Sequence, residues 1–145
     1  YMDMAIEAAK KAFLKNEVPV GCVIVRDGEV LAVTYNQKES KNCVTKHAEI
    51  LAVEKASDRI HNWRLDGCDV YVTLEPCPMC ASALKQARVS HIYCGLSNSD
   101  LNNFKIVSEI LKQDKNNKEV LITNDLAVEK VDFLMKKFFQ NRRNS

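Results

Sequence analysis

The stretch Leu74-Glu-Pro-Cys-Pro-Met-Cys80, LEPCPMC, joins two kinds of predicted secondary structure and places two thiols three positions apart. Before its cysteines, the β-branched segment DVYVTLE (69–75) predicts a strand. After them, MCASALKQA (79–87) predicts a helix, because proline is tolerated in a first turn whose amides lack partners. A strand that runs straight into a helix indicates an α/β arrangement.

The same alternation continues on both sides of this junction. VGCVIV (20–25) and EVLAVTYN (29–36) predict a β-hairpin, because the intervening Asp27-Gly28 readily supplies the positive φ angles of a tight turn. Hydrophobic spacing and composition predict further helices at 2–15, 48–57, 104–113 and 125–140, and further strands at 91–95 and 119–123. We therefore predict an α/β fold, with a mixed five-stranded sheet covered by helices on both faces.

Composition indicates one globular domain over residues 1–145. Hydrophobic residues make up 46% and charged residues 28%, which excludes intrinsic disorder. The longest apolar or small run, 18–25, is far shorter than the roughly 20 residues that span a bilayer, so we expect no membrane segment. No repeat, low-complexity tract or linker divides the chain.

Six cysteines are spread along the chain, which fits a reducing compartment in which most thiols are inert. Cys22 and Cys94 lie in predicted strands and are expected to fill the core, and Cys68 lies at a turn. No basic and apolar leader precedes the first helix, so we expect a cytoplasmic protein.

Positive charge is concentrated at the C-terminal end. Residues 130–145 carry five Lys or Arg against one Asp, a net charge of +4, which leaves −2 for the rest of the chain. A basic end on a slightly acidic body indicates a polyanionic partner, although basic ends are also commonly just solvated.

A second stretch, KHAEI (46–50), supplies a histidine that can bind a metal together with the two thiols. Alone, Cys-x-x-Cys can be a redox pair and His-Ala-Glu an ordinary helix start. Together, His47, Cys77 and Cys80 give the three ligands of a catalytic zinc site, with the fourth position open for water. Thiols three apart share one side of a helical turn, whose unpaired amides favour thiolates. We predict one Zn²⁺ per subunit; iron is not strictly excluded, and Cys43 as a fourth ligand would close the site.

Glu49 stands two residues after His47, where side chains in mid-helix would diverge by roughly 200°. Both reach one site if they lie at the entrance of the helix, so we place them in its first turn. Zinc lowers the pKa of bound water to about 7, giving hydroxide at neutral pH. Glu49 can carry the water proton to a ring nitrogen and later deliver a proton to a departing amine. His-x-Glu followed by Pro-Cys-x-x-Cys is the known signature of zinc deaminases.

Segments along nearly the whole chain resemble the bacterial tRNA-specific adenosine deaminases of the cytidine-deaminase-like superfamily. The segments are EVPVGCVIV (17–25), YN (35–36), HAEI (47–50), NWRL (62–65), YVTLEPCPMCASAL (71–84) and FFQNRR (138–143). The resemblance implies a three-layer αβα fold and a homodimer. It also implies conversion of adenosine to inosine at the wobble position of a tRNA anticodon stem-loop.

The resemblance also implies substrate contacts. Asn36 matches the family's base-contacting asparagine, and Val20 and the backbone around Ala48 match pocket positions. The last helix falls where the family meets RNA, with rings and guanidinium groups that suit splayed bases and phosphates. Its four candidate contacts are Phe138, Phe139, Arg142 and Arg143. From its spacing, Phe138 is also expected to face the core together with Leu134.

Two other functions stay open. One is a deaminase of the same fold that acts on a free base, nucleoside or nucleotide, such as guanine or cytosine. The basic C-terminal helix argues against it, since a small substrate needs no external arginine pair. The other is a non-catalytic zinc-binding subunit. Glu49 argues against that, because a structural site gains nothing from an acid beside an open coordination position.

Residues 95–105, GLSNSDLNNFK, depart from the family pattern. Asn98 stands where the family has Asp, in a loop expected to hold the anticodon, and we include it among the substrate contacts. A neutral Asn98 repels phosphate less than a carboxylate and is expected to loosen the choice between RNA and DNA. Asn98→Asp should therefore change the ratio of activities on matched RNA and DNA stem-loops. An unchanged ratio contradicts this interpretation of Asn98.

Overall fold

The computed structural model describes residues 1–143 as five helices and five strands. In chain order they are α1 (Met2–Leu14), β1 (Gly21–Arg26), β2 (Glu29–Tyr35), α2 (Ala48–Ile60), β3 (Asp69–Leu74), α3 (Pro78–Gln86), β4 (His91–Leu96), α4 (Leu101–Leu111), β5 (Leu121–Thr123) and α5 (Val128–Arg143). The types and order of these elements agree with the sequence prediction. Residues 144–145, which the single-domain expectation included, lie outside the described residues.

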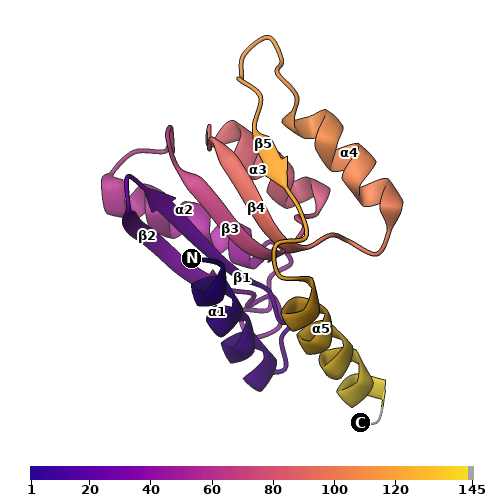
Figure 1. Cartoon of the computed structure of the whole chain (residues 1–145). Coiled ribbons are helices and arrows are strands. Elements are labelled where there is room, and N and C mark those ends of the chain that lie inside the picture. Colours follow the sequence, from indigo (N-terminus) through magenta and orange to yellow (C-terminus); the bar gives the residue numbers. More distant parts are fainter. Residues whose placement is uncertain (144–145) are drawn as a thin grey trace.

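The described strands form one mixed sheet in the order β2-β1-β3-β4-β5. β1 pairs antiparallel with both β2 and β3, whereas β3 pairs parallel with β4, and β4 with β5. Helices α1 and α5 cover one face of the sheet, and α2, α3 and α4 cover the other (Figure 1). The predicted three-layer αβα arrangement with a mixed sheet is confirmed.

The hairpin between β1 and β2 turns at Asp27-Gly28, as predicted. Both residues have positive φ, 51° and 79°, which is the conformation of a type I′ turn. At the open end of the hairpin, the Asn36 amide donates to the Val20 carbonyl over 3.0 Å. The turn and a one-residue register shift at Ile24/Val25 together place two of the predicted substrate contacts side by side.

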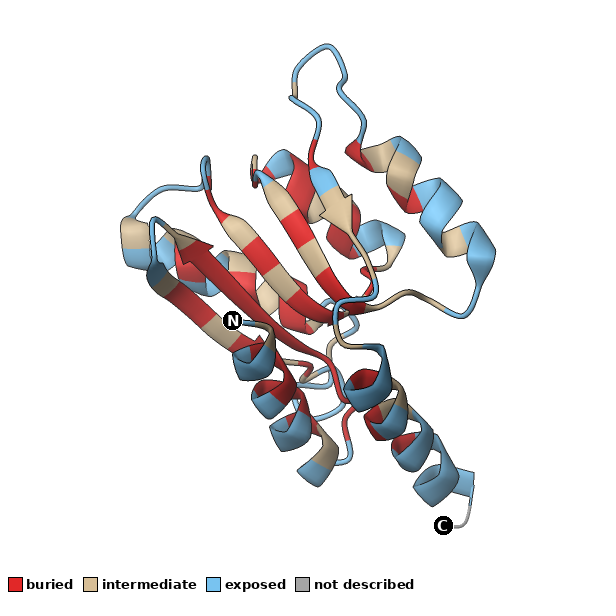
Figure 2. Cartoon of the chain, viewed as in Figure 1, coloured by how far each residue is buried: buried red, intermediate tan, exposed pale blue. Residues whose placement is uncertain are grey.

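The main hydrophobic core lies between the sheet and the layer of α2, α3 and α4. Buried and half-buried residues alternate along β3 and β4, because the opposite face is less completely covered (Figure 2). On that face the Tyr71 ring stacks on Tyr93 of the neighbouring strand, with centroids 4.7 Å apart, and the Tyr93 ring stacks on His91 of the same strand, with centroids 4.0 Å apart. His91 is thus a structural residue, and its Nε2 lies 2.7 Å from Thr123 Oγ1.

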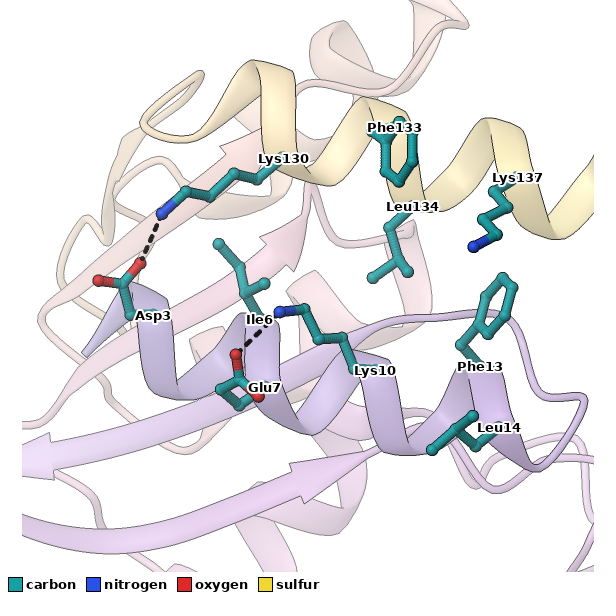
Figure 3. Close-up of a pocket in the computed structure, with 10 residues that line it drawn as sticks. All are labelled: Asp3, Ile6, Glu7, Lys10, Phe13, Leu14, Lys130, Phe133, Leu134 and Lys137. Atoms are coloured by element: carbon teal, nitrogen blue, oxygen red, sulfur yellow. Dashed lines mark hydrogen bonds and ion pairs between the residues drawn. The ribbon is translucent and has the colours of Figure 1, made fainter.

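Helix α5 packs against α1 along an apolar strip (Figure 3). Ile6 and Leu134 lie between the two helices near Phe13, and an exposed ion pair joins Lys130 Nζ to Asp3 Oδ1 over 3.4 Å. An exposed ion pair contributes little stability, so burial of the apolar side chains is the main attachment of α5. This attachment orients the basic C-terminal end of the chain.

Helix boundaries differ from the prediction where the backbone is capped. Helix α2 continues past residue 57 and ends where His61 takes a left-handed conformation with φ 54°. Helix α4 starts earlier than predicted, because the Asp100 side chain accepts a hydrogen bond from the Asn102 amide as an N-cap. Helix α5 starts later, after Asp125, whose positive φ of 64° cannot continue a helix.

The six cysteines, all within residues 1–143, are free. Cys22 and Cys94 are fully buried, as predicted for core residues, and burial raises the pKa of both thiols well above the ordinary value. Cys68 is also fully buried. No helix within residues 1–143 has the length and apolar character needed to cross a membrane.

Candidate active site

The predicted metal ligands lie at the starts of α2 and α3. His47 is the N-cap of α2 and Cys77 the N-cap of α3, and both have extended backbone, with ψ 154° and 168°. Cys80 lies within the first turn of α3, whose first residue is Pro78. Proline is suited to that position because its missing N–H would have no helical partner. The backbone at each cap therefore turns the chain out of an extended segment and into a helix at the site.

The ligand atoms of these residues have a spacing that fits zinc. His47 Nδ1 lies 3.8 Å from Cys77 Sγ and 3.5 Å from Cys80 Sγ, and all three atoms lie within 4.8 Å of one another. Tetrahedral zinc, with Zn–S of about 2.3 Å and Zn–N of about 2.0 Å, would hold N and S atoms about 3.5 Å apart. The donor set of one imidazole and two thiols also suits this borderline-soft ion.

Cys43 lies outside this group of ligand atoms. Its Sγ is 3.3 Å from Thr45 Oγ1, in the loop that precedes α2. With His47, Cys77 and Cys80 as protein ligands, a tetrahedral metal keeps one position for solvent, which is the arrangement of catalytic rather than structural zinc sites.

Hydrogen bonding favours the thiolate of Cys77. The Cys80 thiol and the backbone amides of Cys80 and Met79 all donate toward it, and these bonds lower the pKa of Cys77 to about 5. As the donor of that pair, Cys80 has a raised pKa. Metal binding releases the remaining proton, because a thiol ligates as its thiolate.

Glu49 lies in the first turn of α2 and is 4% exposed. Burial is the main cause that raises the pKa of its carboxyl group to about 7. A carboxyl group that titrates near neutral pH can both accept and return a proton. Glu49 lines the same cavity as His47 and Cys77, so the predicted proton shuttle lies beside the predicted metal ligands.

The cavity at this site has a volume of about 230 Å³. It is smaller than the roughly 300–1,000 Å³ of sites for drug-sized molecules and suits a single flat ring system. The predicted substrate contacts that line it are Val20, Asn36, Ala48 and Asn98. The residues that line it but were not among the sequence candidates are Val18, Lys38, Leu74 and Glu75. Leu74 and Glu75 belong to the LEPCPMC motif, so their place beside the metal ligands could have been predicted from the sequence. The sequence carries no comparable indication that Lys38 lines the cavity.

Asn36 is 8% exposed and is only loosely held. Its side-chain amide donates to the Val18 carbonyl, and its Oδ1 accepts from the Lys38 amide, both over 3.4 Å. Such long hydrogen bonds are weak, so Asn36 can exchange them for contacts to a base edge. The loop that follows is firmly fixed, because fully buried Glu17 accepts hydrogen bonds from two of its backbone amides.

Phe138 does not reach the cavity. It is 4% exposed, and its ring packs edge-on against Phe13, with centroids 6.2 Å apart. Its expected place in the core is thus observed, whereas the direct substrate contact predicted for it is not supported by the geometry. The Arg142 guanidinium lies over the Phe138 ring, 5.3 Å from its centroid.

Phe139 and Arg143 line a second depression, a groove of about 840 Å³ between α5 and the loop after β4. Leu74 and Asn98 line both this groove and the catalytic cavity, so the two depressions are neighbours. Phe139 is 44% exposed and Arg143 is exposed. The structure therefore brings these two residues of the last helix to the rim of the site.

The sequence matches the family model for the cytidine and deoxycytidylate deaminase zinc-binding region over residues 1–96. The chain belongs to this deaminase family. A tRNA-specific adenosine deaminase of Streptococcus pyogenes serotype M1 is 35% identical over 143 residues, which are 99% of this chain and 84% of the relative. A second such enzyme, from Bacillus subtilis, is also 35% identical and is covered to 89%.

One solved structure similar to this deaminase comes from a study of A-to-I editing by tRNA deaminases at the wobble position. Its TM-score is 0.84 at 33% identity, with 92% of this chain and 97% of the other covered. Both the zinc-binding family and the spacing of His47, Cys77 and Cys80 identify the metal as zinc.

Replacing Glu49 should separate metal binding from catalysis. Because Glu49 lies beside the metal position without belonging to the ligand group, Glu49→Ala should keep about one zinc per chain. Loss of the proton shuttle should lower turnover at least about a hundredfold. Metal analysis of purified protein and single-turnover kinetics measure the two effects. His47→Ala is the control that should lose zinc, and loss of zinc from Glu49→Ala as well would contradict the assigned role.

Proposed function

We propose that this deaminase hydrolyses adenosine to inosine at the wobble position of a tRNA anticodon. The observation that carries the proposal is that two neighbouring depressions share the lining residues Leu74 and Asn98. One is a base-sized cavity lined by Glu49 and the metal ligands His47 and Cys77, and the other is an open groove with an exposed ring and guanidinium. A free base would occupy only the first. A nucleotide within a strand would occupy both, and the tRNA-specific relatives support that reading.

The chemistry replaces the 6-amino group of adenine by oxygen. When bound by His47, Cys77 and Cys80, zinc would supply the Lewis acid that lowers the pKa of a water to about 7. Glu49 accepts a proton from the attacking water, whose oxygen bonds to C6, and donates this proton to ring nitrogen N1. Glu49 then transfers the second water proton to the amino group, the C6–N bond breaks and ammonia leaves, so that adenosine and water give inosine and ammonia.

Three residues position the base in this proposal. Asn36 offers its side-chain amide to the purine edge, and Val20 supplies an apolar wall. The backbone of Ala48 is fixed by the Thr34 hydroxyl, which donates to the Ala48 carbonyl over 2.7 Å. The base is thereby held beside Glu49, one residue further along α2.

The neighbouring nucleotides lie in the groove along α5 in this proposal. The exposed Phe139 ring offers a surface on which a splayed base can stack, and Arg143 offers a guanidinium for phosphate. The packing of α5 on α1 carries both side chains to the groove. Arg142, which lies over the Phe138 ring, adds positive charge to the same end of the helix.

We further propose that the enzyme acts as a cytoplasmic homodimer and that its chain forms one domain. The free thiols in residues 1–143 suit a reducing compartment. The dimer follows from the resemblance to the tRNA-specific adenosine deaminases.

A substrate panel tests the function. The zinc-loaded protein is incubated with a stem-loop that carries wobble adenosine, with free adenosine, and with guanine, cytosine and cytidine, and the products are identified by mass spectrometry. Inosine should form only in the stem-loop, because only a strand fills both cavity and groove. A stem-loop with wobble guanosine is the matched control.

Other results of the panel would contradict the proposal. A guanine deaminase of Bacillus subtilis is 28% identical with a TM-score of 0.67, covering 100% of this chain and 92% of the other. Turnover of a free base alone would place this protein with such enzymes. No turnover of any substrate would indicate a non-catalytic zinc-binding subunit.

A further inference from the structure

Glu75 is a buried carboxylate inside the metal-binding motif. The proposed deamination mechanism gives it no role. Glu75 is 2% exposed and lies between the end of β3 and Cys77. Burying a carboxylate costs free energy unless hydrogen-bond donors surround it. The donors that face Glu75 therefore indicate what it holds in place.

Two amide side chains from distant parts of the chain donate to this carboxylate. Asn103 Nδ2, on α4, lies 2.5 Å from Glu75 Oε2, and Asn124 Nδ2, after β5, lies 2.9 Å from Oε1. Asn103 Nδ2 also donates to the Pro76 carbonyl over 3.1 Å. One side chain of α4 is thus fastened to the peptide that immediately precedes Cys77.

These contacts enclose the loop 97–100, which carries Asn98. The loop is held at its start by the Ser97 amide, which donates to Asp125 Oδ1 over 2.9 Å, directly beside Asn124. Within the loop, the Asp100 amide donates to Asn98 Oδ1 over 2.9 Å. The loop then enters α4, where Asn103 reaches back to Glu75. The loop is therefore held at its start by the segment after β5 and at its end by Glu75 of the metal-binding motif.

We propose that Glu75, Asn103 and Asn124 form a clamp that positions the loop 97–100 against the metal-binding loop, and so sets the opening between catalytic cavity and groove. The parallel pairing of β3 and β4 ends at Leu74 and Leu96. Beyond that point no strand pairing holds Asn98, and the hydrogen bonds of the clamp connect the two chain segments instead. Charge-assisted hydrogen bonds are the stronger kind, and a buried carboxylate between two donors has little freedom to move.

The clamp acts on substrate affinity rather than on the chemical step. His47 and Glu49 lie at the start of α2, Cys77 is the N-cap of α3, and Cys80 lies within the first turn of α3. Releasing Asn103 frees the loop 97–100 and leaves these residues supported by their own helices. The three clamp residues are positioning residues, and this effect on the substrate rests on the proposed function.

Asn103→Ala tests the clamp, with Asn102→Ala as the matched control. Asn102 is the exposed neighbour on the same helix and takes part in the cap through its backbone amide. In zinc-loaded protein, hydrogen exchange of peptides covering 96–104 should rise at least about tenfold in Asn103→Ala, because a buried hydrogen bond to a charged group is lost. Peptides from α2 and the zinc content should not change, and Asn124→Ala should give the same local result.

Kinetics with the wobble-adenosine stem-loop supply the second readout. KM should rise about tenfold in Asn103→Ala, whereas kcat should change less than about threefold. Unchanged exchange at 96–104 in both clamp variants would overturn the proposal. Loss of zinc with an unchanged KM would also overturn it, because the three residues would then position the metal ligands and not the loop 97–100. If the parent protein does not act on the stem-loop, the proposed function fails while the exchange result still decides the clamp.

Discussion

The structure depends on two helices that begin at one place. Because α2 and α3 start side by side, the imidazole of His47 and the sulfurs of Cys77 and Cys80 come within 4.8 Å of one another. Backbone amides in the first turn of α3 donate hydrogen bonds to the Cys77 thiolate. Burial of Glu49 in the first turn of α2 raises the pKa of its carboxyl group to about 7. Metal affinity and proton transfer therefore follow from one feature of the fold.

Local sequence signals were sufficient for this centre. Asp27-Gly28 predicted the hairpin turn and Pro78 suited the start of α3, because both act through the backbone conformation of one or two residues. The spacing of three between the thiols placed both on one helical turn. Placing His47 and Glu49 at a helix entrance required only the helical period. The deaminase family and the αβα architecture are confirmed, whereas the role of each substrate-contact residue stays a prediction.

The surroundings of the centre depend on contacts that no local pattern reveals. Asn103 and Asn124 meet Glu75 across 28 and 49 positions of the chain, and nothing in their neighbourhoods indicates a shared carboxylate. Helical spacing predicted that Phe138 faces the core, but it did not indicate that its neighbour Phe139 faces the groove. The position of α5 on α1 brings Phe139 there, and that packing is a tertiary property.

X-ray absorption at the zinc edge of the purified protein tests the centre most directly. One imidazole, two thiolates and one water predict two sulfur neighbours at about 2.3 Å and two lighter neighbours at about 2.0 Å. Three sulfur neighbours and one lighter neighbour would mean that Cys43 or another thiol closes the site, and a shell without sulfur would place the metal elsewhere. Either of these results would contradict a catalytic zinc held where α2 and α3 begin.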